Sequence, residues 1–422
     1  MKKAFGASIF SITILMSLHN NVALANVVQP PETRQSVKAN AGNGFYYPAN
    51  RWAYQHMQQL YPSANIDGQH YSTGLPKTPQ NLDDLIVKDG KGNHVKLTQY
   101  LAETYTDAFI VVKNDKIIYE KYLNGQNNRS RHQMMSVTKS ISSTAIQPLI
   151  DEGKIDPNAK VTQYVPELAD SAWADATVQQ VRDMLVSLDY TENYDDPKSG
   201  FNNYLRAMGF AAPDAEQNDT IGIHKFLQGI KKGKGEHGKI FNYATPNTDV
   251  LCWIAQKASG KSAETLIDQN LWSKLSTIRD AYILVDRQGQ AFCGAGSNAT
   301  AVDLAKFGMI MANDGKLGNQ QIVSKNYVDE VIKGGSKEAF DNSHYAHFES
   351  TKGWTYKDQW WIRNNPNHAF AAVGIYDQIV YVDPTAKVVV VKQSSRKVAE
   401  KDDDDTAVYT VIDTIISKLD HK

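Results

Sequence analysis

Short hydrophobic runs bounded by turn residues predict a β-sheet built from two distant parts of the chain. Residues 108–122, AFIVVKNDKIIYEKY, contain two β-rich runs around an Asn-Asp pair, which is typical of a tight hairpin. Near the C-terminus, QIVYVD and KVVVVKQS form two more runs, with the turn Pro-Thr-Ala between them. A further run, AYILVD, begins at Ala281. We therefore expect a sheet to which both halves of the chain contribute.

Three other stretches have the spacing of helices. Residues 136–152 place apolar side chains four apart and are followed by a glycine, and Pro148 predicts a kink in the second half. In residues 245–260, TPNTDVLCWIAQKASG, Thr245 is expected to cap a helix that the final glycine ends. Residues 407–419 have one apolar side. We expect this last helix to cover the sheet.

The order of these patterns divides the chain into five parts. The stretch before residue 80 is rich in Asn, Gln, Pro and Tyr and predicts irregular structure with a short helix at 53–60. The middle of the chain is mostly helical, between two portions that form sheet. The predicted parts are a signal peptide (1–25), an irregular N-terminal wrap (26–80), a first α/β part (81–156), a mostly helical domain (157–275) and a second α/β part (276–422).

The composition excludes several classes of protein. The chain has 422 residues, with 45 basic and 46 acidic side chains, so a role in binding nucleic acid is disfavoured. After the N-terminus no stretch is apolar for the roughly 20 residues that a membrane span needs. We expect a globular mature protein with no membrane span, and the sequence does not determine its oligomeric state.

The first residues have the features of a processing signal. Lys2 and Lys3 form a basic start, residues 4–18 are mostly apolar, and Ala23-Leu24-Ala25 is a small-x-small cleavage site. Cleavage after Ala25 predicts an exported protein, which is periplasmic or secreted. The alternative, an N-terminal membrane anchor, is disfavoured because two asparagines interrupt the apolar run.

The chain has two cysteines, Cys252 and Cys293, on separate predicted elements. A disulfide is compatible with an exported protein, but spacing alone does not establish it. Two buried thiols are the simpler interpretation.

Ser136 and Lys139 in HQMMSVTKSIS are candidates for nucleophilic catalysis. Residues three apart on a helix share one face, so the hydroxyl and the amine can form a hydrogen bond. Burial lowers the pKa of a lysine from about 10.4, which allows the amine to accept a proton. A serine at a helix N-terminus also points backbone N–H groups at an oxyanion formed there. The alternative is a capping serine beside a solvated lysine.

Two further segments supply groups that such a site needs. Tyr243 stands just before a predicted helix and could carry protons to or from a leaving group, although a packing tyrosine is the simpler interpretation. In AFAAVGIYDQIVYVDP, Gly374 would let the backbone approach a ligand, and the N–H of Ile375 could be a second oxyanion donor. A glycine in a strand is more often a bulge.

A metal site is disfavoured. His344 and His347 are three apart in SHYAHFE, and Glu349 follows, but the chain has no His-Glu-x-x-His pattern and the stretch resembles a loop. We expect no metal and no cofactor.

In this order, these elements resemble the serine β-lactamase and penicillin-binding protein superfamily, in particular its class C-like part. The similarity runs from about residue 50 to the C-terminus. It is most specific for the branch that contains 6-aminohexanoate-dimer hydrolase and related esterases. The segments that carry it are NRWAYQHMQQLYP, MMSVTKS, DEGKIDPNAKVTQYVPEL, TENYDDPKS, FNYATPNTDVLCWIAQKASGKS, DLAKFGMIMANDG and GIYDQIVYVDP.

The resemblance implies an α/β (α+β) fold, in which an antiparallel sheet is flanked by helices and an all-helical domain is inserted, with the active site between the two. It implies that Ser136 is acylated, that Lys139 is its base and that Tyr243 transfers the proton to the leaving group. The backbone N–H groups of Ser136 and Ile375 would bind the oxyanion. Tyr194, in the loop TENYDDP, would contact the substrate, with Gly374 and Tyr376 as further contacts; for Tyr194 a turn residue is an equal alternative.

Two departures from the superfamily bear on the substrate. Where penicillin-recognising relatives carry Lys-Thr-Gly, this chain has Ala372-Val373-Gly374, so the cation that would pair with a β-lactam carboxylate is missing. The tyrosine motif reads Tyr-Ala-Thr instead of Tyr-x-Asn, which removes an amide. We expect an exported serine hydrolase for small esters or linear amides. The alternatives are a D-alanyl peptidase or β-lactamase, and a non-catalytic sensor or binding protein.

Overall fold

The computed structural model describes residues 43–420, except for 69–71, 73 and 213–219. The predicted signal peptide and cleavage site lie outside the described residues. Within the described ranges, no helix is both long enough and apolar enough to cross a membrane.

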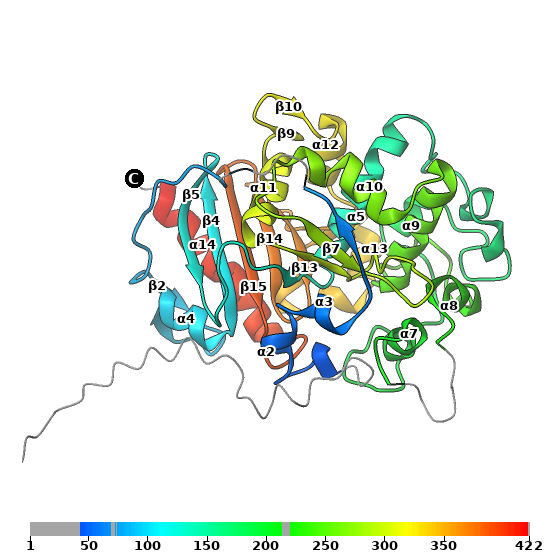
Figure 1. Cartoon of the computed structure of the whole chain (residues 1–422), viewed down its shortest axis with the longest axis horizontal. Coiled ribbons are helices and arrows are strands. Elements are labelled where there is room, and N and C mark those ends of the chain that lie inside the picture. Colours follow the sequence, from blue (N-terminus) through cyan, green and yellow to red (C-terminus); the bar gives the residue numbers. More distant parts are fainter. Residues whose placement is uncertain (1–42, 69–71, 73, 213–219, 421–422) are drawn as a thin grey trace, which may run out of the picture.

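The main sheet has seven antiparallel strands and joins the two halves of the chain, as predicted (Figure 1). The two halves join where β15 pairs with β4, in a register that runs from Val388 opposite Lys113 to Ser394 opposite Thr106. In spatial order the strands are β11 (Thr355–Lys357), β12 (Trp360–Ile362), β13 (Phe370–Gly374), β14 (Gln378–Asp383), β15 (Val388–Ser394), β4 (Thr106–Lys113) and β5 (Lys116–Tyr122).

The hairpin between β4 and β5 is confirmed. Asn114 and Asp115 have φ angles of 49° and 62°, the left-handed values that a two-residue turn of the I′ type requires. Asparagine and aspartate tolerate this conformation better than most side chains, so the turn follows directly from the sequence.

A second sheet of four strands was not predicted. It contains β1 (Ser63–Ile66), β7 (Ala281–Leu284), β8 (Ser297–Ala299) and β6 (His132–Gln133) in this order. Thus AYILVD is a strand, as expected, but it belongs to this sheet and does not continue the main one. The predicted irregular wrap likewise contributes β1, which pairs with β7. The helix expected at 53–60 is two short helices, α2 (Asn50–Ala53) and α3 (Met57–Leu60).

Helices dominate the chain between β6 and β7. After α5 (Val137–Asp151), the α-helices are α6 (Val178–Arg182), α7 (Gly200–Met208), α8 (Ile223–Gly229), α9 (Thr245–Ser259) and α10 (Ala263–Asn270). Pro148 lies inside α5, and the kink expected there stays a prediction. Gly260 ends α9 with a φ of 70°, as predicted. Thr245 does not cap this helix; Ala244 is at the N-cap and Thr245 begins the first turn.

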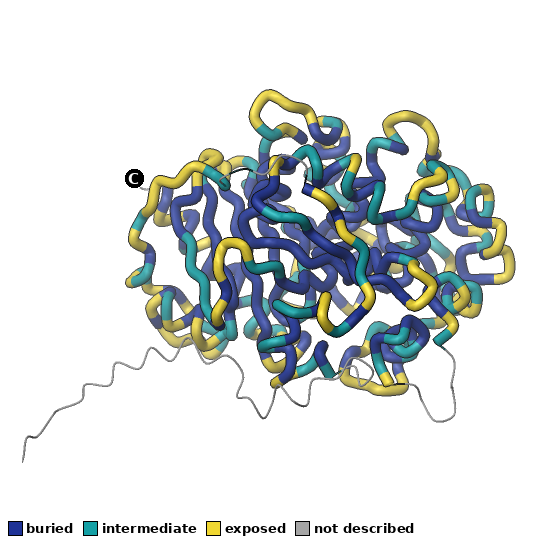
Figure 2. Tube along the Cα trace, viewed as in Figure 1, coloured by how far each residue is buried: buried dark blue, intermediate teal, exposed yellow. Residues whose placement is uncertain are grey.

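The main sheet is covered on both faces, so its central strands are apolar on both sides. On β15, Val389 and Val391 belong to one hydrophobic cluster, with α5 and α11 (Ala301–Ala312), whereas Val388 and Val390 belong to another, with α14 (Asp402–Asp420). This alternation follows from the two-residue period of a strand. The prediction that the C-terminal helix covers the sheet is confirmed. Figure 2 shows the continuous burial of these strands.

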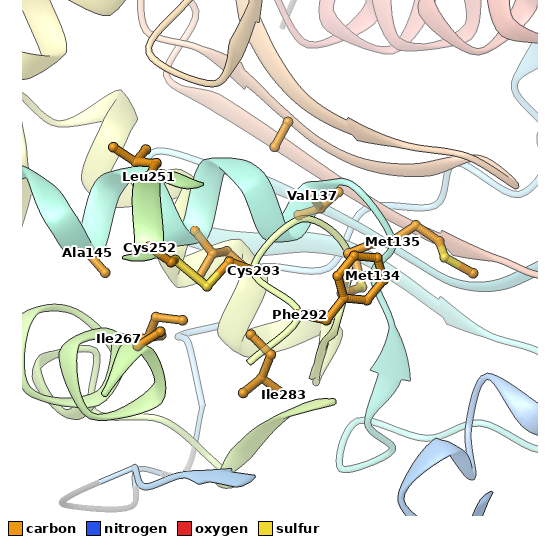
Figure 3. Close-up of a cluster of buried hydrophobic side chains, with 14 of the residues drawn as sticks. Met134, Met135, Val137, Ala145, Leu251, Cys252, Ile267, Ile283, Phe292 and Cys293 are labelled. Atoms are coloured by element: carbon orange, nitrogen blue, oxygen red, sulfur yellow. A yellow bond between two sulfur atoms is a disulfide. The ribbon is translucent and has the colours of Figure 1, made fainter. Parts of the chain in front are cut away.

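Cys252 and Cys293 form a disulfide, with their Cα atoms 6.6 Å apart. The simpler interpretation of two buried thiols is therefore wrong. The bond links α9 to the segment between β7 and β8, and Figure 3 shows it among buried apolar side chains that include Phe292 and Val137.

Candidate active site

Ser136 occupies the N-cap position of α5, but its hydroxyl does not cap the helix. The oxygen instead accepts a hydrogen bond of 2.8 Å from the Nζ of Lys139. The preceding residue, Met135, has a φ of 46°, a conformation that side chains other than glycine and asparagine rarely adopt and that recurs at functional sites. The interpretation of Ser136 as an ordinary capping serine is therefore not supported.

Lys139 is 1 % exposed, which excludes a solvated surface lysine. Besides Ser136, its Nζ contacts the Oγ1 of Thr245 at 3.0 Å and the carbonyl oxygen of Gly294 at 2.8 Å. Burial lowers the pKa of Lys139 to about 8, although the negative charges of Glu192 and Asp249 oppose the shift. A substantial fraction of this amine is therefore neutral near pH 8 and can accept a proton.

Tyr243 lies beside both groups. Its hydroxyl interacts with the side chain of Ser136, and the Nζ of Lys139 is 4.9 Å from the centre of its ring. Burial raises the pKa of Tyr243 well above its usual value, so the phenol keeps its proton at neutral pH. Trp361 and Tyr356 pack against the ring, with centroids 5.4 and 6.0 Å away, and fix its orientation.

Glu192 is a polar residue of the site that the sequence did not single out. Its Oε2 accepts the backbone N–H of Thr245 at 2.9 Å, and its Oε1 accepts the hydroxyl of Thr245. Because that hydroxyl also contacts Lys139, a chain of hydrogen bonds runs from Glu192 through Thr245 to Lys139. Burial raises the pKa of Glu192. Glu192 lies in the loop TENYDDP, which the sequence analysis considered, but only Tyr194 of that loop was predicted to be a site residue. The Tyr194 hydroxyl is 3.3 Å from the Oε1 of Glu192.

Gly294 and Asp249 complete the surroundings of the lysine. The Gly294 carbonyl accepts from Lys139, while its N–H donates to the Oδ1 of Asp249 at 3.3 Å. Tyr204 donates to the other oxygen of Asp249 at 3.0 Å, and burial raises the pKa of this carboxyl to about 7. A side chain at position 294 would collide with Thr245. Gly294 directly follows Cys293, so the disulfide lies one residue from a partner of Lys139.

Gly374, the last residue of β13, allows this strand to lie against the backbone before the nucleophile. A Cβ at this position would be 2.6 Å from the carbonyl oxygen of Met134 and 2.9 Å from the backbone nitrogen of Ser136. The sequence predicted that Gly374 lets the backbone approach a ligand closely. The close approach is present, but it is to the backbone of Met134 and Ser136. It places Ile375, the next residue, beside Ser136, and the two N–H groups remain the predicted oxyanion donors.

Two cavities lie beside Ser136, and both are lined by Ser136, Tyr194 and Ile375. The first contains about 70 Å³ of open space and is also lined by Tyr243, Gly374 and several charged side chains. The second is apolar and is also lined by Phe45, Met135, Phe201, Phe292 and Tyr376. The structure thus brings all the residues predicted from sequence, namely Ser136, Lys139, Tyr243, Tyr194, Gly374, Ile375 and Tyr376, to one place.

Comparison with known proteins shows the family of the chain. A family model described as Beta-lactamase matches residues 96–412. The chain belongs to the β-lactamase family. It is 37% identical over 349 residues to 6-aminohexanoate-dimer hydrolase of Paenarthrobacter ureafaciens, covering 82% of this chain and 86% of the relative.

Solved structures agree with this family. A Bacillus anthracis protein, provisionally named as a 6-aminohexanoate-dimer hydrolase, superposes with a TM-score of 0.83 at 29% identity, over 92% of this chain and 98% of the other. A family VIII carboxylesterase superposes with a TM-score of 0.53 at 16% identity, over 73% and 92% of the two chains, and shares the fold alone. The β-lactamase/transpeptidase-like fold expected from the sequence is confirmed.

In this member of the β-lactamase family, the strand beside the nucleophile carries no cation in the three positions before Ile375. Ala372 is buried in the sheet, and Val373 lines the first cavity. The charged residues of the cavity come instead from the turn between β13 and β14, the segment before α14 and the first turn of α14. Arg396 is paired with Asp405 at 2.6 Å, and the buried Lys392 is paired with Asp377.

Glu400 is the charged residue of this cavity that has no such pair. Its carboxylate makes no hydrogen bond or ion pair with any residue that the structure describes. Glu400 is exposed at the edge of the cavity, but desolvation of its carboxyl by nearby protein atoms, and next the negative charge of Asp405, raise its pKa to about 7. A carboxylate is therefore available to a ligand that occupies the cavity, most fully above pH 7.

The histidines considered as metal ligands do not form such a site. His344 and His347 lie in one 3-10 helix, where the His344 ring packs on Tyr345 with centroids 4.1 Å apart. Across the described ranges, no group of three or more His, Cys, Asp or Glu side chains is placed to hold a metal ion.

Proposed function

We propose that this protein is an exported serine hydrolase that cleaves small esters or linear amides through an acyl-enzyme on Ser136. The observation that carries the proposal is the 2.8 Å contact between the Ser136 hydroxyl and the Nζ of Lys139, a buried amine whose pKa is about 8. A lysine with its usual pKa would be almost fully protonated at neutral pH and could not serve as a base.

In the proposed reaction, the neutral amine of Lys139 takes the proton of the Ser136 hydroxyl as its oxygen attacks the carbonyl carbon. The carbonyl oxygen becomes an oxyanion, which the N–H groups of Ser136 and Ile375 stabilise. Tyr243 donates its phenolic proton to the leaving alkoxide or amine and recovers a proton from the lysinium. A water molecule then gives a proton to the neutral amine of Lys139 as its oxygen attacks the acyl carbon. The bond between the acyl carbon and the Ser136 oxygen breaks, the serine oxygen takes that proton, and the acid is released.

The substrate class rests on the relatives and on the two cavities. The Paenarthrobacter relative is named for the hydrolysis of a 6-aminohexanoate dimer, a linear amide. The apolar cavity beside Ser136 has an open volume of about 20 Å³ and the charged cavity about 70 Å³, which favours a small acyl group in the first and a small polar leaving group in the second. A D-alanyl peptidase or β-lactamase is the second candidate. The lack of a cation at Ala372 and Val373 disfavours it, and covalent labelling by a fluorescent penicillin would support it.

Export is proposed from the N-terminal residues, with cleavage after Ala25. The disulfide between Cys252 and Cys293 is consistent with this location, because disulfides persist in the periplasm and outside the cell but rarely in the cytosol. N-terminal sequencing of the mature protein would test the cleavage site.

The central test compares Ser136→Ala with the wild type in the hydrolysis of p-nitrophenyl acetate. Loss of the nucleophile should lower kcat/KM by about a thousandfold or more. Ser143→Ala is a matched control, because Ser143 lies on the same helix, is buried and makes no side-chain hydrogen bond within the described structure. Equal rates for wild type and Ser136→Ala would refute the hydrolase and favour a binding protein. A fluorophosphonate adduct mapped by mass spectrometry to the Ser136 peptide would support the enzyme.

A further inference from the structure

A larger cavity lies away from Ser136, and its open volume is about 590 Å³. We call it the arginine cavity; it lies between helices α2 and α3, the loop 124–131 and the start of β7. Its described lining residues are Arg51, Trp52, Gln55, His56, Gln58, Gln59, Asn124, Gly125, Ser130, Arg131, Arg279 and Tyr282. None of them lines either cavity at Ser136. Its volume is in the range that small-molecule sites occupy.

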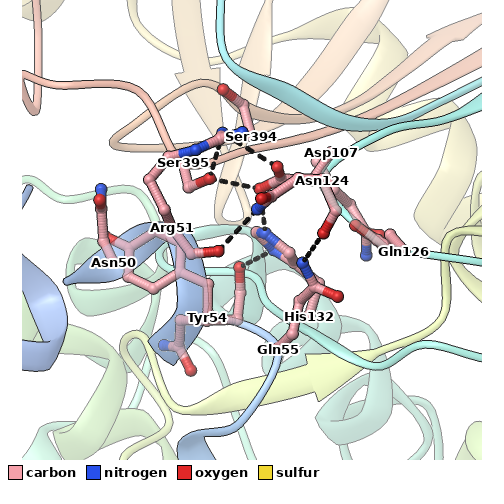
Figure 4. Close-up of polar contacts among 12 residues, drawn as sticks. Asn50, Arg51, Tyr54, Gln55, Asp107, Asn124, Gln126, His132, Ser394 and Ser395 are labelled. Atoms are coloured by element: carbon pink, nitrogen blue, oxygen red, sulfur yellow. Dashed lines mark hydrogen bonds and ion pairs between the residues drawn. The ribbon is translucent and has the colours of Figure 1, made fainter. Parts of the chain in front are cut away.

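The described lining of the arginine cavity contains three guanidinium groups and no carboxylate. Arg51 is neutralised, because its Nη1 is 3.0 Å from the Oδ1 of Asp107, in a buried polar network with His132 (Figure 4). Arg131 and Arg279, by contrast, form no ion pair with any residue that the structure describes. These two arginines are therefore the candidates for binding an anion.

The two guanidinium groups are close enough to repel one another. Burial lowers the pKa of Arg131, and the charge of Arg279 is the next contribution in the same direction. The negative charge of Asp280 raises the pKa of Arg131 and so offsets part of this lowering. The Asp280 carboxylate also accepts a hydrogen bond of 2.8 Å from the backbone N–H of Gly68. Two like charges held close together destabilise a fold unless an anion between them compensates.

Both groups are held in place by contacts that leave most of their donors available. Arg131 donates from Nη2 to the Oε1 of Gln58 at 2.7 Å and stacks over the ring of Tyr282 at 4.5 Å. Arg279 donates from Nη1 to the carbonyl oxygen of Arg129 at 2.7 Å. A guanidinium has five N–H donors in a rigid fork that matches the oxygens of a carboxylate or phosphate. Restrained guanidinium groups lose little entropy when they bind such a ligand.

We propose that the arginine cavity binds a small organic anion, whose carboxylate or phosphate group lies between Arg131 and Arg279. Trp52 and His56 provide rigid aromatic surface in the lining for the organic part of the ligand, since their rings are stacked on each other with centroids 4.2 Å apart and an interplanar angle of 5°. The hydroxyl of Ser130 is a further polar group in the lining. This site is independent of the proposed hydrolase reaction at Ser136.

The test uses isothermal titration calorimetry on the full mature chain with two probes, inorganic phosphate and benzoate, at low ionic strength. Phosphate reports on the oxyanion alone, and benzoate adds a ring that can lie on Trp52. Binding of either probe with a Kd below about 1 mM supports the site. The Arg131→Gln/Arg279→Gln double variant should weaken that binding at least tenfold. Added sodium chloride should weaken it in the wild type, because the contact is ionic.

Arg129→Gln is the matched control, because Arg129 is an exposed arginine of the same loop that does not line the cavity. It should bind the probe as the wild type does. Hydrolysis of p-nitrophenyl acetate should be the same in all variants, which shows that the double variant is folded; if it is not, Arg279→Gln alone provides the comparison. The proposal is overturned if neither probe binds to the wild type, or if the arginine variants bind as tightly as Arg129→Gln.

Discussion

The side-chain nitrogen of Lys139 lies 2.8 Å from the hydroxyl oxygen of Ser136, one helical turn earlier on α5, and is withdrawn from water. Removal of this amine should abolish the reaction while the fold remains. We expect Lys139→Met to lower kcat/KM for a p-nitrophenyl ester by about a thousandfold, because no other group replaces the base. Lys257→Met, which alters an exposed lysine of α9, should keep the wild-type rate. Near-normal activity of Lys139→Met would exclude the proposed base.

The rate should depend on pH through Lys139. Because the amine must be neutral to accept a proton, kcat/KM should rise with pH and level off above a midpoint near 8, the pKa of this lysine. Below the midpoint it should fall about tenfold per pH unit. The measurement is a pH profile of kcat/KM, corrected for hydrolysis of the ester by hydroxide.

Glu192 should set the position of that midpoint. Its negative charge raises the pKa of Lys139, so Glu192→Gln should move the midpoint to lower pH while keeping an oxygen to accept from Thr245. Tyr194→Phe, a change in the same loop that removes no charge at neutral pH, should leave the midpoint in place. A shift of the Glu192→Gln profile to higher pH would contradict the electrostatic explanation.

The disulfide should affect both stability and turnover. It closes a loop across 41 residues, and the loss of such a bond typically lowers the free energy of unfolding by about 2–4 kcal/mol. In a Cys252→Ala/Cys293→Ala variant we also expect kcat to fall more than KM changes, because Cys293 adjoins the carbonyl of Gly294 that holds Lys139. Urea denaturation and steady-state kinetics measure the two effects. An unchanged kcat would show that the bond serves stability alone.

Gly374→Ala should impair catalysis through backbone geometry. The added Cβ would lie 2.6 Å from the Met134 carbonyl oxygen and 2.9 Å from the Ser136 nitrogen, so β13 must move away from the proposed oxyanion site. We expect a fall of at least tenfold in kcat. Gly229→Ala is the control, because nothing lies within 4 Å of a Cβ there. It should retain full activity.

Glu400 should influence the choice of substrate. Its carboxylate faces the charged cavity without a partner in the described structure, so it should favour an ester that carries an amine over a neutral ester of the same length. Glu400→Gln should reduce this ratio of kcat/KM values, and the reduction should be larger above pH 7, where the wild-type carboxyl is ionised. If Glu400→Gln leaves this ratio of kcat/KM values unchanged at pH 8, the amine of the substrate does not contact Glu400.

The sequence by itself determined the local features of this protein. The spacing of Ser136 and Lys139 within one turn, the hairpin at Asn114 and Asp115, and the end of α9 at Gly260 all involve residues close in the chain. Such features follow from helix periodicity and backbone sterics, which act over a few residues. The sequence also marked Tyr243 and Ile375 as candidates, and the family resemblance implied their roles.

Only the tertiary structure decided which distant segments meet. A short hydrophobic run identified the strand that begins at Ala281 but not its sheet, because such a run does not specify a partner strand. Thr245 and Gly294 contact Lys139, and Glu192 reaches it through Thr245, from three separate segments, so the local sequence could not show that these groups surround the lysine. The pairing of Cys252 with Cys293 likewise requires their distance in space. Packing brought these groups together, and burial in that packed interior lowers the pKa of Lys139 to about 8, as its proposed role as a base requires.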